Sequence, residues 1–380
     1  MKTINLHIYP TNIKLESRIL KETASLAKLK LFDNIIIVGI REDGDKESER
    51  LDDIREIRLI SLKTKILPKG SFWKVFNYIE WFLRIILTYN KENIKSVNCH
   101  VLSVLPLGIF FKIFKNSKVI YDTHELETET EQISKARKLI LKIVERRLIN
   151  HVDGVIVVSD SIADWYKTGY KLKQVDIVRN IPYKQDNDLP QSKILKDKFN
   201  IRDNEMLFIF QGVLSKYRGV DILLNVFSRL DAQRNIVFMG YGPMQPIIKT
   251  YEERHPNIHF QPAVSQSEVA KYTSSADVGL SILENTCLSI YYSLPNKLFE
   301  YIVSGLPVII SDLPEMAKIV DDNDIGWKVP VDEESIIKLI KGISLHDIAQ
   351  KKRNVLNCRD QFNWETEEKV LKAAYNQIFK

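Results

Sequence analysis

Residues 293–312 read SLPNKLFEYIVSGLPVIISD, which is typical of a complete helix followed by a buried strand. Ser293 can cap the helix start, and Pro295 fits the first turn, where a missing backbone N–H costs nothing. Gly305 can end the helix, because only glycine enters the left-handed conformation cheaply. The β-branched run at 308–310 predicts a parallel strand that is covered on both faces.

The start of this helix has the chemistry of a phosphate site. Free backbone N–H groups and the partial positive charge of a helix N-terminus favour an anion, and Lys297 adds a full positive charge. Glu300 follows about one turn later, where it can accept hydrogen bonds from a sugar ring attached to that phosphate. By itself, the segment also fits an ordinary strand–helix unit of any α/β protein.

The chain has 380 residues, which is long for one core and natural for two domains. Its three cysteines, Cys99, Cys287 and Cys358, lie far apart without a C-x-x-C pair, so neither a zinc site nor a disulfide framework is expected. This usage fits a reducing cytoplasm. A first strand begins almost at the N-terminus, and no apolar run is long enough to span a membrane, so we expect neither a secretory leader nor a transmembrane segment.

Strands and helices alternate in the first half of the chain. The expected elements are strands at 4–9, 35–40, 56–62 and 118–122, a helix at about 15–29 and a charged connection at 41–54. This order predicts a doubly wound parallel sheet. The first strand-to-helix turn, at 9–12, has no glycine, which argues against a dinucleotide site in this half.

Residues 71–88 are rich in aromatic and aliphatic side chains, with Lys74 and Arg84 among them. From 69 to 118 the chain carries eight Lys or Arg residues against two acidic ones. Two interpretations compete: a core helix packed on the sheet, and an interfacial surface that touches anionic membrane lipid. We expect one face to pack and the other to contact the membrane, within residues 71–118. No nucleic-acid recognition motif accompanies the charge, so nucleic acid is not expected as a partner.

The strand at 118–122 ends at Thr123-His124-Glu125, and ligands of open α/β sheets bind beyond the carboxyl ends of strands. His124 therefore lies where chemistry would occur. The glutamates that follow alternate along the chain, and we expect all four to be solvated: Glu125, Glu127, Glu129 and Glu131.

Two glycine turns mark the second half. An apolar strand at 206–211 ends at Gly212, and a basic loop with Arg218 leads to Gly219, which fits a phosphate cradle. A strand at 236–239 runs into the second turn, Gly240-Tyr241-Gly242.

The segment Pro295-Asn296-Lys297-Leu298-Phe299-Glu300-Tyr301 resembles the donor-binding segment of the retaining GT-B glycosyltransferases of family 4, the glycosyl transferases group 1. The resemblance implies that Glu300 holds the nucleotide ribose and that the amides of Asn296, Lys297 and Leu298 hold the pyrophosphate.

Other segments carry the same resemblance. The element from Gly212 to Gly219 implies that Arg218 neutralises the leaving pyrophosphate, although Val213 stands where family members often have a basic residue. Gly240 and Gly242 recur at the expected place in the donor domain. The Asp-x-His-Glu element implies that His124 points to the donor sugar.

The implied fold is GT-B, with two Rossmann-like, doubly wound parallel-sheet domains that face a cleft. We expect an acceptor-binding domain at 1–183, joined by a returning C-terminal helix at about 362–380. A polar linker at 183–192 leads to a nucleotide-sugar-binding domain at 191–361.

The implied activity is transfer of a sugar from a nucleoside-diphosphate sugar to an acceptor hydroxyl, with retention and catalysis by His124, Arg218 and Lys297. We expect no metal and no cofactor besides the donor, because the Asp-x-Asp patterns at 43, 186 and 322 lie in polar connections. The expected acceptor is a lipid-linked or membrane-bound glycan in surface polysaccharide synthesis. The expected location is the cytoplasm, at the inner face of the membrane.

Two alternatives remain open. A GT-B sugar-nucleotide epimerase would turn over the donor without an acceptor. A non-catalytic nucleotide-binding scaffold is favoured by Tyr292, which stands eight residues before Glu300, where many family members carry a second glutamate.

Overall fold

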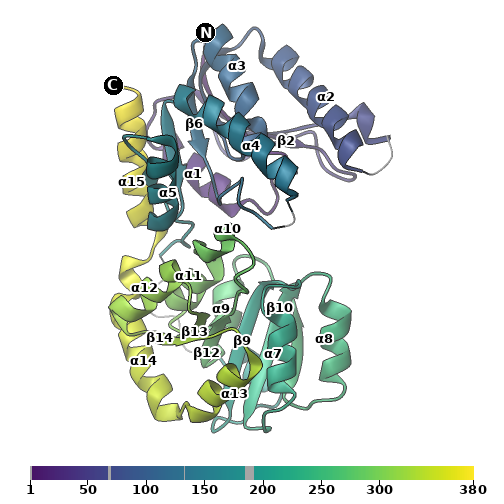
Figure 1. The fold of residues 1–380 in the computed structure, drawn as a ribbon, viewed down its shortest axis with the longest axis vertical. Helices are drawn as coiled ribbons and strands as arrows, with labels where there is room; N and C mark the ends of the chain where they lie inside the picture. Colours follow the sequence, from purple (N-terminus) through teal and green to yellow (C-terminus); the bar gives the residue numbers. More distant parts are fainter. Residues whose placement is uncertain (1, 67–69, 132, 185–191) are drawn as a thin grey trace. The chain divides into compact units, whose positions relative to one another are not determined.

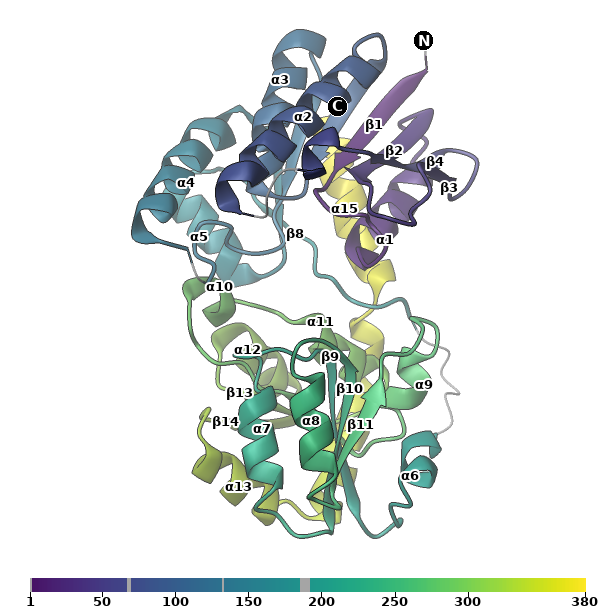
Figure 2. The same cartoon turned by 90° about the vertical axis from the view of Figure 1, so that its right-hand side faces the viewer.

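The computed structural model describes residues 2–66, 70–131, 133–184 and 192–380, which form two compact units (Figures 1 and 2). Unit 1 comprises Met1–Arg179 and Glu368–Lys380, and unit 2 comprises Asn180–Glu367. Most of the predicted linker, and Lys69 of the basic segment, lie outside the described residues.

Unit 1 is built on an eight-stranded sheet with the order β3-β4-β2-β1-β5-β6-β7-β8. Its strands are β1 Thr3–Ile8, β2 Asn34–Ile40, β3 Ser48–Arg50, β4 Arg55–Ile60, β5 Asn93–Cys99, β6 Lys118–Asp122, β7 Gly154–Val157 and β8 Asp176–Ile177. All neighbouring strands are parallel except β3 and β4. The sequence interpretation was wrong at this edge, because the charged connection contains β3. All three side chains of β3 are exposed, so the strand has no apolar pattern to reveal it.

Within the described residues, six α-helices surround this sheet: α1 Ser17–Ala27, α2 Ser71–Tyr89, α3 Leu105–Lys115, α4 Lys135–Leu148, α5 Asp160–Tyr170 and α15 Trp364–Ile378, which begins in unit 2. Figures 1 and 2 show α2, α3 and α4 gathered on one side of the sheet. The C-terminal helix α15 is fixed to unit 1 by a hydrogen bond between Tyr375 and Asn98 of β5 and by an ion pair of 2.7 Å between Glu368 and Lys28.

The direction of strand addition in unit 1 reverses between β1 and β5. From β1 the chain adds β2 and β4 on one side, and from β5 it adds β6, β7 and β8 on the other. Such a reversal opens a crevice beyond the carboxyl ends of the two central strands, where open α/β sheets bind ligands. The carboxyl ends of β1 and β5 are therefore the ligand-binding position that the topology predicts for unit 1, and β6 lies beside them.

Helix α2 has two different faces. Trp81, Ile85 and Tyr89 are fully buried, as expected for a helix that packs on a sheet. Its opposite face exposes half or more of four aliphatic side chains: Val75, Ile79, Leu83 and Leu87. The packed face is confirmed, and the side chain of Phe72 lies outside the described residues. Within the described residues, no helix combines the length and the apolar character that crossing a bilayer requires.

Unit 2 is built on a six-stranded parallel sheet with the order β11-β10-β9-β12-β13-β14. Its strands are β9 Met206–Val213, β10 Arg234–Tyr241, β11 Ile258–Pro262, β12 Val278–Ser281, β13 Val308–Ser311 and β14 Gly326–Val329. Its helices are α6 Ile194–Lys198, α7 Val220–Phe227, α8 Gln245–Glu252, α9 Val269–Thr273, α10 Leu288–Tyr291, α11 Asn296–Val303, α12 Pro314–Asn323, α13 Glu333–Gly342 and α14 Leu345–Cys358.

Two apolar cores lie on the two faces of this sheet. One joins the strands to α7, α8 and α13, and the other joins them to α11, α12 and α14. The direction of strand addition reverses between β9 and β12. The carboxyl ends of these two strands are thus the ligand-binding position that the topology predicts for unit 2.

Candidate functional site

Helix α11 follows β12 at the reversal point of unit 2 and ends as its sequence predicts. Gly305 has φ +78°, and its N–H donates to Ile302 while the N–H of Leu306 donates to Tyr301. This pair of bonds is the Schellman arrangement, which requires a left-handed residue after the helix. The helix begins later than predicted, at Asn296, because Pro295 occupies the capping position. The capping role of Ser293 is therefore wrong, and its hydroxyl instead donates to the carbonyl of Ile290.

Lys297, in the first turn of α11, is a buried amine without a hydrogen-bond partner. Only 9% of the residue is exposed, and its Nζ lies 3.5 Å from the centroid of the Phe210 ring. Burial, followed by the nearby positive charge of Arg218, lowers the pKa of Lys297 to about 7, and Glu300 acts in the opposite direction. A lysine that gives up part of its charge in this way is typical of a site that is completed by an anion.

Glu300 lies one turn further along α11, where it accepts a hydrogen bond of 2.5 Å from Gln211 Nε2. Gln211 is itself held by the Thr273 hydroxyl, which donates to its side-chain oxygen over 2.6 Å. The Tyr301 hydroxyl accepts the Gln211 N–H and donates to the carbonyl of Leu280, so it joins β9 to β12. These bonds fix the carboxylate at the carboxyl end of β9.

The predicted glycines have different structural roles. A Cβ at Gly240 would lie 1.9 Å from the carbonyl oxygen of Gly212, and one at Gly242 would lie 2.4 Å from that of Leu214. Close approach of β9 to β10 therefore requires both glycines. Gly212 has φ +111°, yet a Cβ there would meet nothing within 4 Å. Its backbone faces open space, as a phosphate cradle needs.

Arg218 lies in the exposed loop between β9 and α7, directly before Gly219, whose φ is +82°. Its effect on the pKa of Lys297 shows that the two cations lie within electrostatic range of one another. In the described part of the chain, Arg218 forms no ion pair with a carboxylate. Unit 2 thus brings Arg218, Lys297 and Glu300 together at the reversal point of its sheet.

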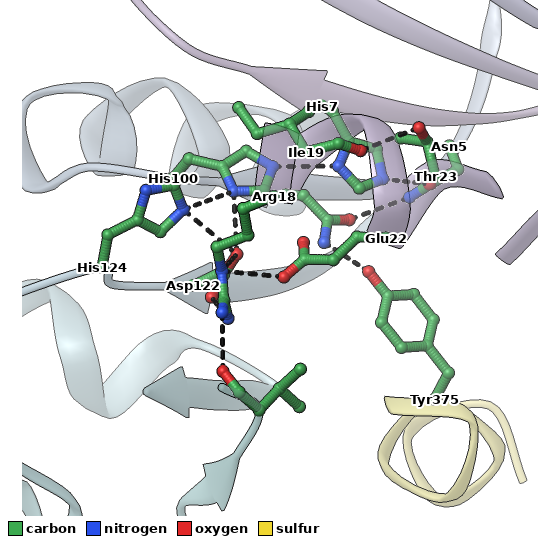
Figure 3. Close-up of polar contacts among 12 residues, drawn as sticks. Asn5, His7, Arg18, Ile19, Glu22, Thr23, His100, Asp122, His124 and Tyr375 are labelled. Atoms are coloured by element: carbon green, nitrogen blue, oxygen red, sulfur yellow. Dashed lines mark hydrogen bonds and ion pairs between the residues drawn. The ribbon is translucent and has the colours of Figure 1, made fainter. Parts of the chain in front are cut away.

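In unit 1, His124 follows β6 and joins a buried polar network (Figure 3). Arg18 of α1 binds both oxygens of Asp122, with Nη2 at 2.6 Å from Oδ1 and Nε at 3.2 Å from Oδ2. His100 Nδ1 lies 2.9 Å and His124 Nε2 lies 3.4 Å from Asp122 Oδ2. We call Arg18, His100, Asp122 and His124 the His124 cluster.

The His124 cluster extends into the interior along a chain of polar contacts. His100 Nε2 lies 2.9 Å from His7 Nδ1, and His7 Nε2 lies 2.7 Å from Asn5 Oδ1. Burial opposes ionisation of Asp122, but Arg18 and the hydrogen bonds from the two histidines outweigh it and hold its pKa well below the usual range. Burial also lowers the pKa of His7 and of His100, so neutral rings are favoured.

The sequence of residues 205–344 matches the model of a known family, described as Glycosyl transferases group 1. Unit 2 carries a domain of this kind. The matched range contains Arg218, Lys297 and Glu300. The predicted enzyme class, a glycosyltransferase, is confirmed through this domain.

Solved structures of low sequence identity share the fold of the whole chain. A sucrose-phosphate synthase from Thermosynechococcus elongatus aligns with a TM-score of 0.79 at 16% identity, over 100% of this chain and 99% of that chain. HepE of Anabaena, solved in complex with UDP and glucose, aligns with a TM-score of 0.72 at 12% identity, over 98% of this chain and 99% of that chain. WaaG, a glycosyltransferase involved in lipopolysaccharide biosynthesis, aligns with a TM-score of 0.64 at 13% identity, over 98% of this chain and 99% of that chain. The predicted GT-B fold is therefore confirmed.

The expectation that the glutamates after His124 are solvated was wrong for two of them. Glu129 is only 7% exposed and pairs with Lys138 and Lys142 of α4. Burial, followed by repulsion from Glu125 and Glu145, raises the pKa of Glu127 to about 8. The alternation along the chain concealed these environments, because it does not show that Glu129 pairs with lysines of α4 or that Glu127 lies near Glu145 of the same helix.

The sequence analysis did not single out Gln211 in unit 2, nor Arg18, His7 and His100 in unit 1. Gln211 is a polar end to an otherwise apolar strand, directly before Gly212, and that position could have revealed it. His7 and His100 lie 93 residues apart, and β5 was not predicted, so no local pattern joins them.

Two groups of side chains in the described residues have metal-ligand geometry: His7, Glu22 and His100, and His100, Asp122 and His124. In the second group, Asp122 is already bound on both oxygens by Arg18, a cation that would repel a metal ion. The lone pairs of Asp122 are thus used inside the protein, so this second group fits a hydrogen-bonded network better than a metal centre.

Proposed function

We propose that the protein transfers a sugar from a nucleoside-diphosphate sugar to an acceptor hydroxyl, with the donor diphosphate bound at the N-terminus of α11. The observation that carries this proposal is the Lys297 amine, which is buried beside a helix start and a second cation and has no hydrogen-bond partner among the described residues. A diphosphate supplies the negative charge that would stabilise the ammonium form.

Each residue then has a proposed role. Arg218 and Lys297 stabilise the charge that develops on the departing diphosphate, with the amides of Asn296, Lys297 and Leu298. Glu300 accepts hydrogen bonds from the ribose, and His124 binds a sugar hydroxyl from unit 1. The backbones of Gly212, Gly240 and Gly242 line the donor. We further propose that the reaction retains the anomeric configuration without a metal.

Uridine diphosphate is the first nucleotide to test, because HepE, which shares the fold, was solved with it. The proposed location is the cytoplasmic face of a membrane, with a lipid-linked glycan as acceptor. Support comes from α2 and from α4, whose exposed Leu139, Ile140 and Ile143 lie among exposed basic side chains such as Arg137 and Arg147. Basic and apolar side chains on one helix suit anionic lipid headgroups.

A thermal-shift screen with the five nucleoside diphosphates tests the donor site, with the matching nucleosides as controls. A ligand that binds the native state raises its melting temperature by mass action. One diphosphate should raise it well above its nucleoside, and incubation of the cognate sugar donor with lipid acceptors should yield a glycosylated product. If no diphosphate shifts the transition, the proposed donor site is wrong.

The same incubation separates the alternatives. An epimerase would convert the donor into a second sugar nucleotide without acceptor. The scaffold, which Tyr292 favours, would bind the diphosphate and release no product from any donor.

Flotation with vesicles tests the membrane part separately. We expect the protein to float with anionic vesicles at low salt, and the double variant Leu139→Gln/Ile143→Gln to stay at the bottom. Ile247→Gln, which changes an exposed isoleucine of unit 2, is the matched control and should float as the wild type does. If the wild-type protein stays at the bottom, the proposed membrane binding is wrong.

A further inference from the structure

Two opposite charges on α11 lie close together without a hydrogen bond between them. Lys297 and Glu300 are three residues apart, a spacing at which helix side chains are neighbours and opposite charges attract. Burial and Arg218 lower the pKa of Lys297 while Glu300 raises it, so the carboxylate acts on the amine. Among the described residues, Lys297 Nζ nevertheless has no hydrogen-bond partner. The surrounding fold must therefore keep the two groups apart.

Two consecutive residues of β9 account for this separation. Phe210 and Gln211 point to opposite faces of the sheet, as neighbours along a strand do. Lys297 Nζ lies 3.5 Å from the centroid of the Phe210 ring, which is a cation–π contact. Glu300 Oε2 instead accepts a hydrogen bond of 2.5 Å from Gln211 Nε2. Each charged group thus has its own neighbour on β9 in place of the other charge.

Gln211 is itself held firmly enough to fix the carboxylate. Only 2% of the residue is exposed. Its backbone N–H donates to the Tyr301 hydroxyl over 3.0 Å, and its Oε1 lies 2.6 Å from the Thr273 hydroxyl. An amide oxygen turned toward Glu300 would meet the lone pairs of the carboxylate, so the NH₂ group faces it. The position of the Glu300 carboxylate therefore depends on this one amide.

An ion pair between Lys297 and Glu300 would make the start of α11 a poor anion site. The amine would be neutralised within the protein, and a diphosphate would have to displace the carboxylate before it could bind. With the charges held apart, the anionic part of a ligand can bind the amine while its hydroxyl groups bind the carboxylate. This arrangement leaves the buried amine without a hydrogen bond in the free protein, which reduces stability and favours binding.

We propose that Gln211 is a positioning residue that prevents an ion pair between Lys297 and Glu300, so that the amine stays available to the donor diphosphate and the carboxylate to the ribose. The inference rests on the proposed function for the identity of that ligand. The separation of the charges is a property of the free protein, and it can be tested without any ligand. Methionine is the test substitution, because it has nearly the volume of glutamine and no amide.

The pKa of Lys297 in the free protein provides the first test. NMR titration of protein labelled with ¹³C-lysine measures it, with the signal assigned by its loss in Lys297→Met. We expect a pKa of about 7 in the wild type. In Gln211→Met the carboxylate loses its donor and turns to the amine, so the pKa should rise towards its ordinary value of 10.5.

The direction of this change identifies its cause. Loss of a polar neighbour alone would lower the pKa of a buried amine, so a rise requires a new pairing with a carboxylate. The melting temperature is recorded to confirm that the variant is folded. An ordinary Lys297 pKa in the wild type, or an unchanged one in folded Gln211→Met, would overturn the proposal.

A double variant shows whether the effect passes through Glu300. Glu300→Gln/Gln211→Met has no carboxylate at this position, so the Lys297 pKa should stay as low as in Glu300→Gln alone. A rise in the double variant contradicts the inference. If Gln211→Met does not fold, Gln211→Asn takes its place, because its amide is one methylene too short to join Thr273 to Glu300. The same rise is expected there, and an unchanged pKa overturns the proposal.

Gln261→Met is the matched control. Gln261 of β11 is also buried, and it pairs with the same residue of β10 as Gln211 does. Its amide accepts from Lys198 over 2.6 Å and donates to the carbonyl of Pro262 over 3.0 Å, so neither contact involves α11. The Lys297 pKa should be that of the wild type. A raised value here would overturn the specific role of Gln211.

UDP binding connects the inference with the proposed function. Calorimetric titration should show about 10-fold weaker binding to Gln211→Met, because the diphosphate then competes with Glu300 for the amine. Binding to Gln261→Met should be unchanged. A raised Lys297 pKa with unchanged UDP affinity would contradict the role of the separation in binding. If the wild type binds no nucleoside diphosphate, the proposed function fails, while NMR of the free protein still decides whether Gln211 separates the charges.

Discussion

The two units each bury a positively charged side chain, and the two sites differ in whether that cation is hydrogen-bonded to its neighbours. In unit 1, Arg18 is matched by Asp122 and Glu22, and its third group donates to the carbonyl of Val178 over 2.6 Å. In unit 2, the Lys297 amine is just as inaccessible and lies over the Phe210 ring without a hydrogen-bond partner. A buried cation that is hydrogen-bonded to carboxylates stabilises the fold that contains it. A buried cation without such a bond reduces stability, so its presence indicates that a ligand supplies the missing partner.

Arg18→Met should have the largest effect on folding. Removing one partner of a buried ion pair leaves the Asp122 carboxylate uncompensated, which costs about 3–5 kcal/mol of unfolding free energy. Urea unfolding monitored by circular dichroism would measure it as a lower midpoint for unit 1. A loss below about 1 kcal/mol would mean that the pairing of Arg18 with Asp122 does not stabilise unit 1.

Lys297→Met should separate function from stability. The variant removes a buried amine that has no hydrogen-bond partner within the described residues, so the urea midpoint should stay the same or rise. Loss of the charged contact should weaken UDP binding by about 1.5–3 kcal/mol, measured by calorimetric titration. A lower midpoint with unchanged UDP affinity is the opposite result, and it would show that Lys297 serves the fold rather than a ligand.

Glu300→Ala tests whether the Glu300 carboxylate binds the ribose of the nucleotide. UDP affinity should fall by about 1–3 kcal/mol because hydrogen bonds from the ribose to a charged group are lost. The control ligand is 2′,3′-dideoxyuridine diphosphate, which lacks those hydroxyls and should bind the variant and the wild type equally. Equal losses for both ligands would argue against ribose recognition by Glu300.

Glu127→Gln should give an effect that depends on pH, and it marks a limit of the comparison, because unit 1 also contains acids whose pKa is raised by burial, such as Glu127 and Glu22. The folded pKa of about 8 exceeds the usual value of 4.5, so between these pH values the unfolded chain is ionised while the folded chain holds its proton. Folding stability therefore falls as pH rises through this window. At pH 8 the variant should melt above the wild type, and at pH 4 the difference should vanish.

Much of unit 2 could be predicted because its signals are local. The helix stop at Gly305, the strand that follows and the run from Pro295 to Tyr301 are all contiguous in the sequence. The error at Ser293 is also local, since a proline at the capping position displaced the helix start. The contacts that surround His124 depend on β1, β5 and β6, which the sheet brings together from distant parts of the chain.

The burial of individual acids could not be predicted for a similar reason. Glu129 and Glu131 look alike in the sequence, but only Glu129 is buried against two lysines of α4. Charge, spacing and composition do not show which side of a loop faces the protein. The unpaired state of Lys297 likewise becomes visible only when Phe210, 87 positions earlier in the chain, is seen beneath it.

The most direct test of the central claim is the number of protons taken up when UDP binds, measured by titration calorimetry at pH 8 in buffers of different ionisation enthalpy. With its pKa near 7, Lys297 is mostly neutral at this pH in the free protein, and a bound diphosphate should restore its charge. The account predicts uptake of close to one proton for each UDP bound by the wild type and none by Lys297→Met. Binding without proton uptake, or equal uptake in both proteins, would contradict it.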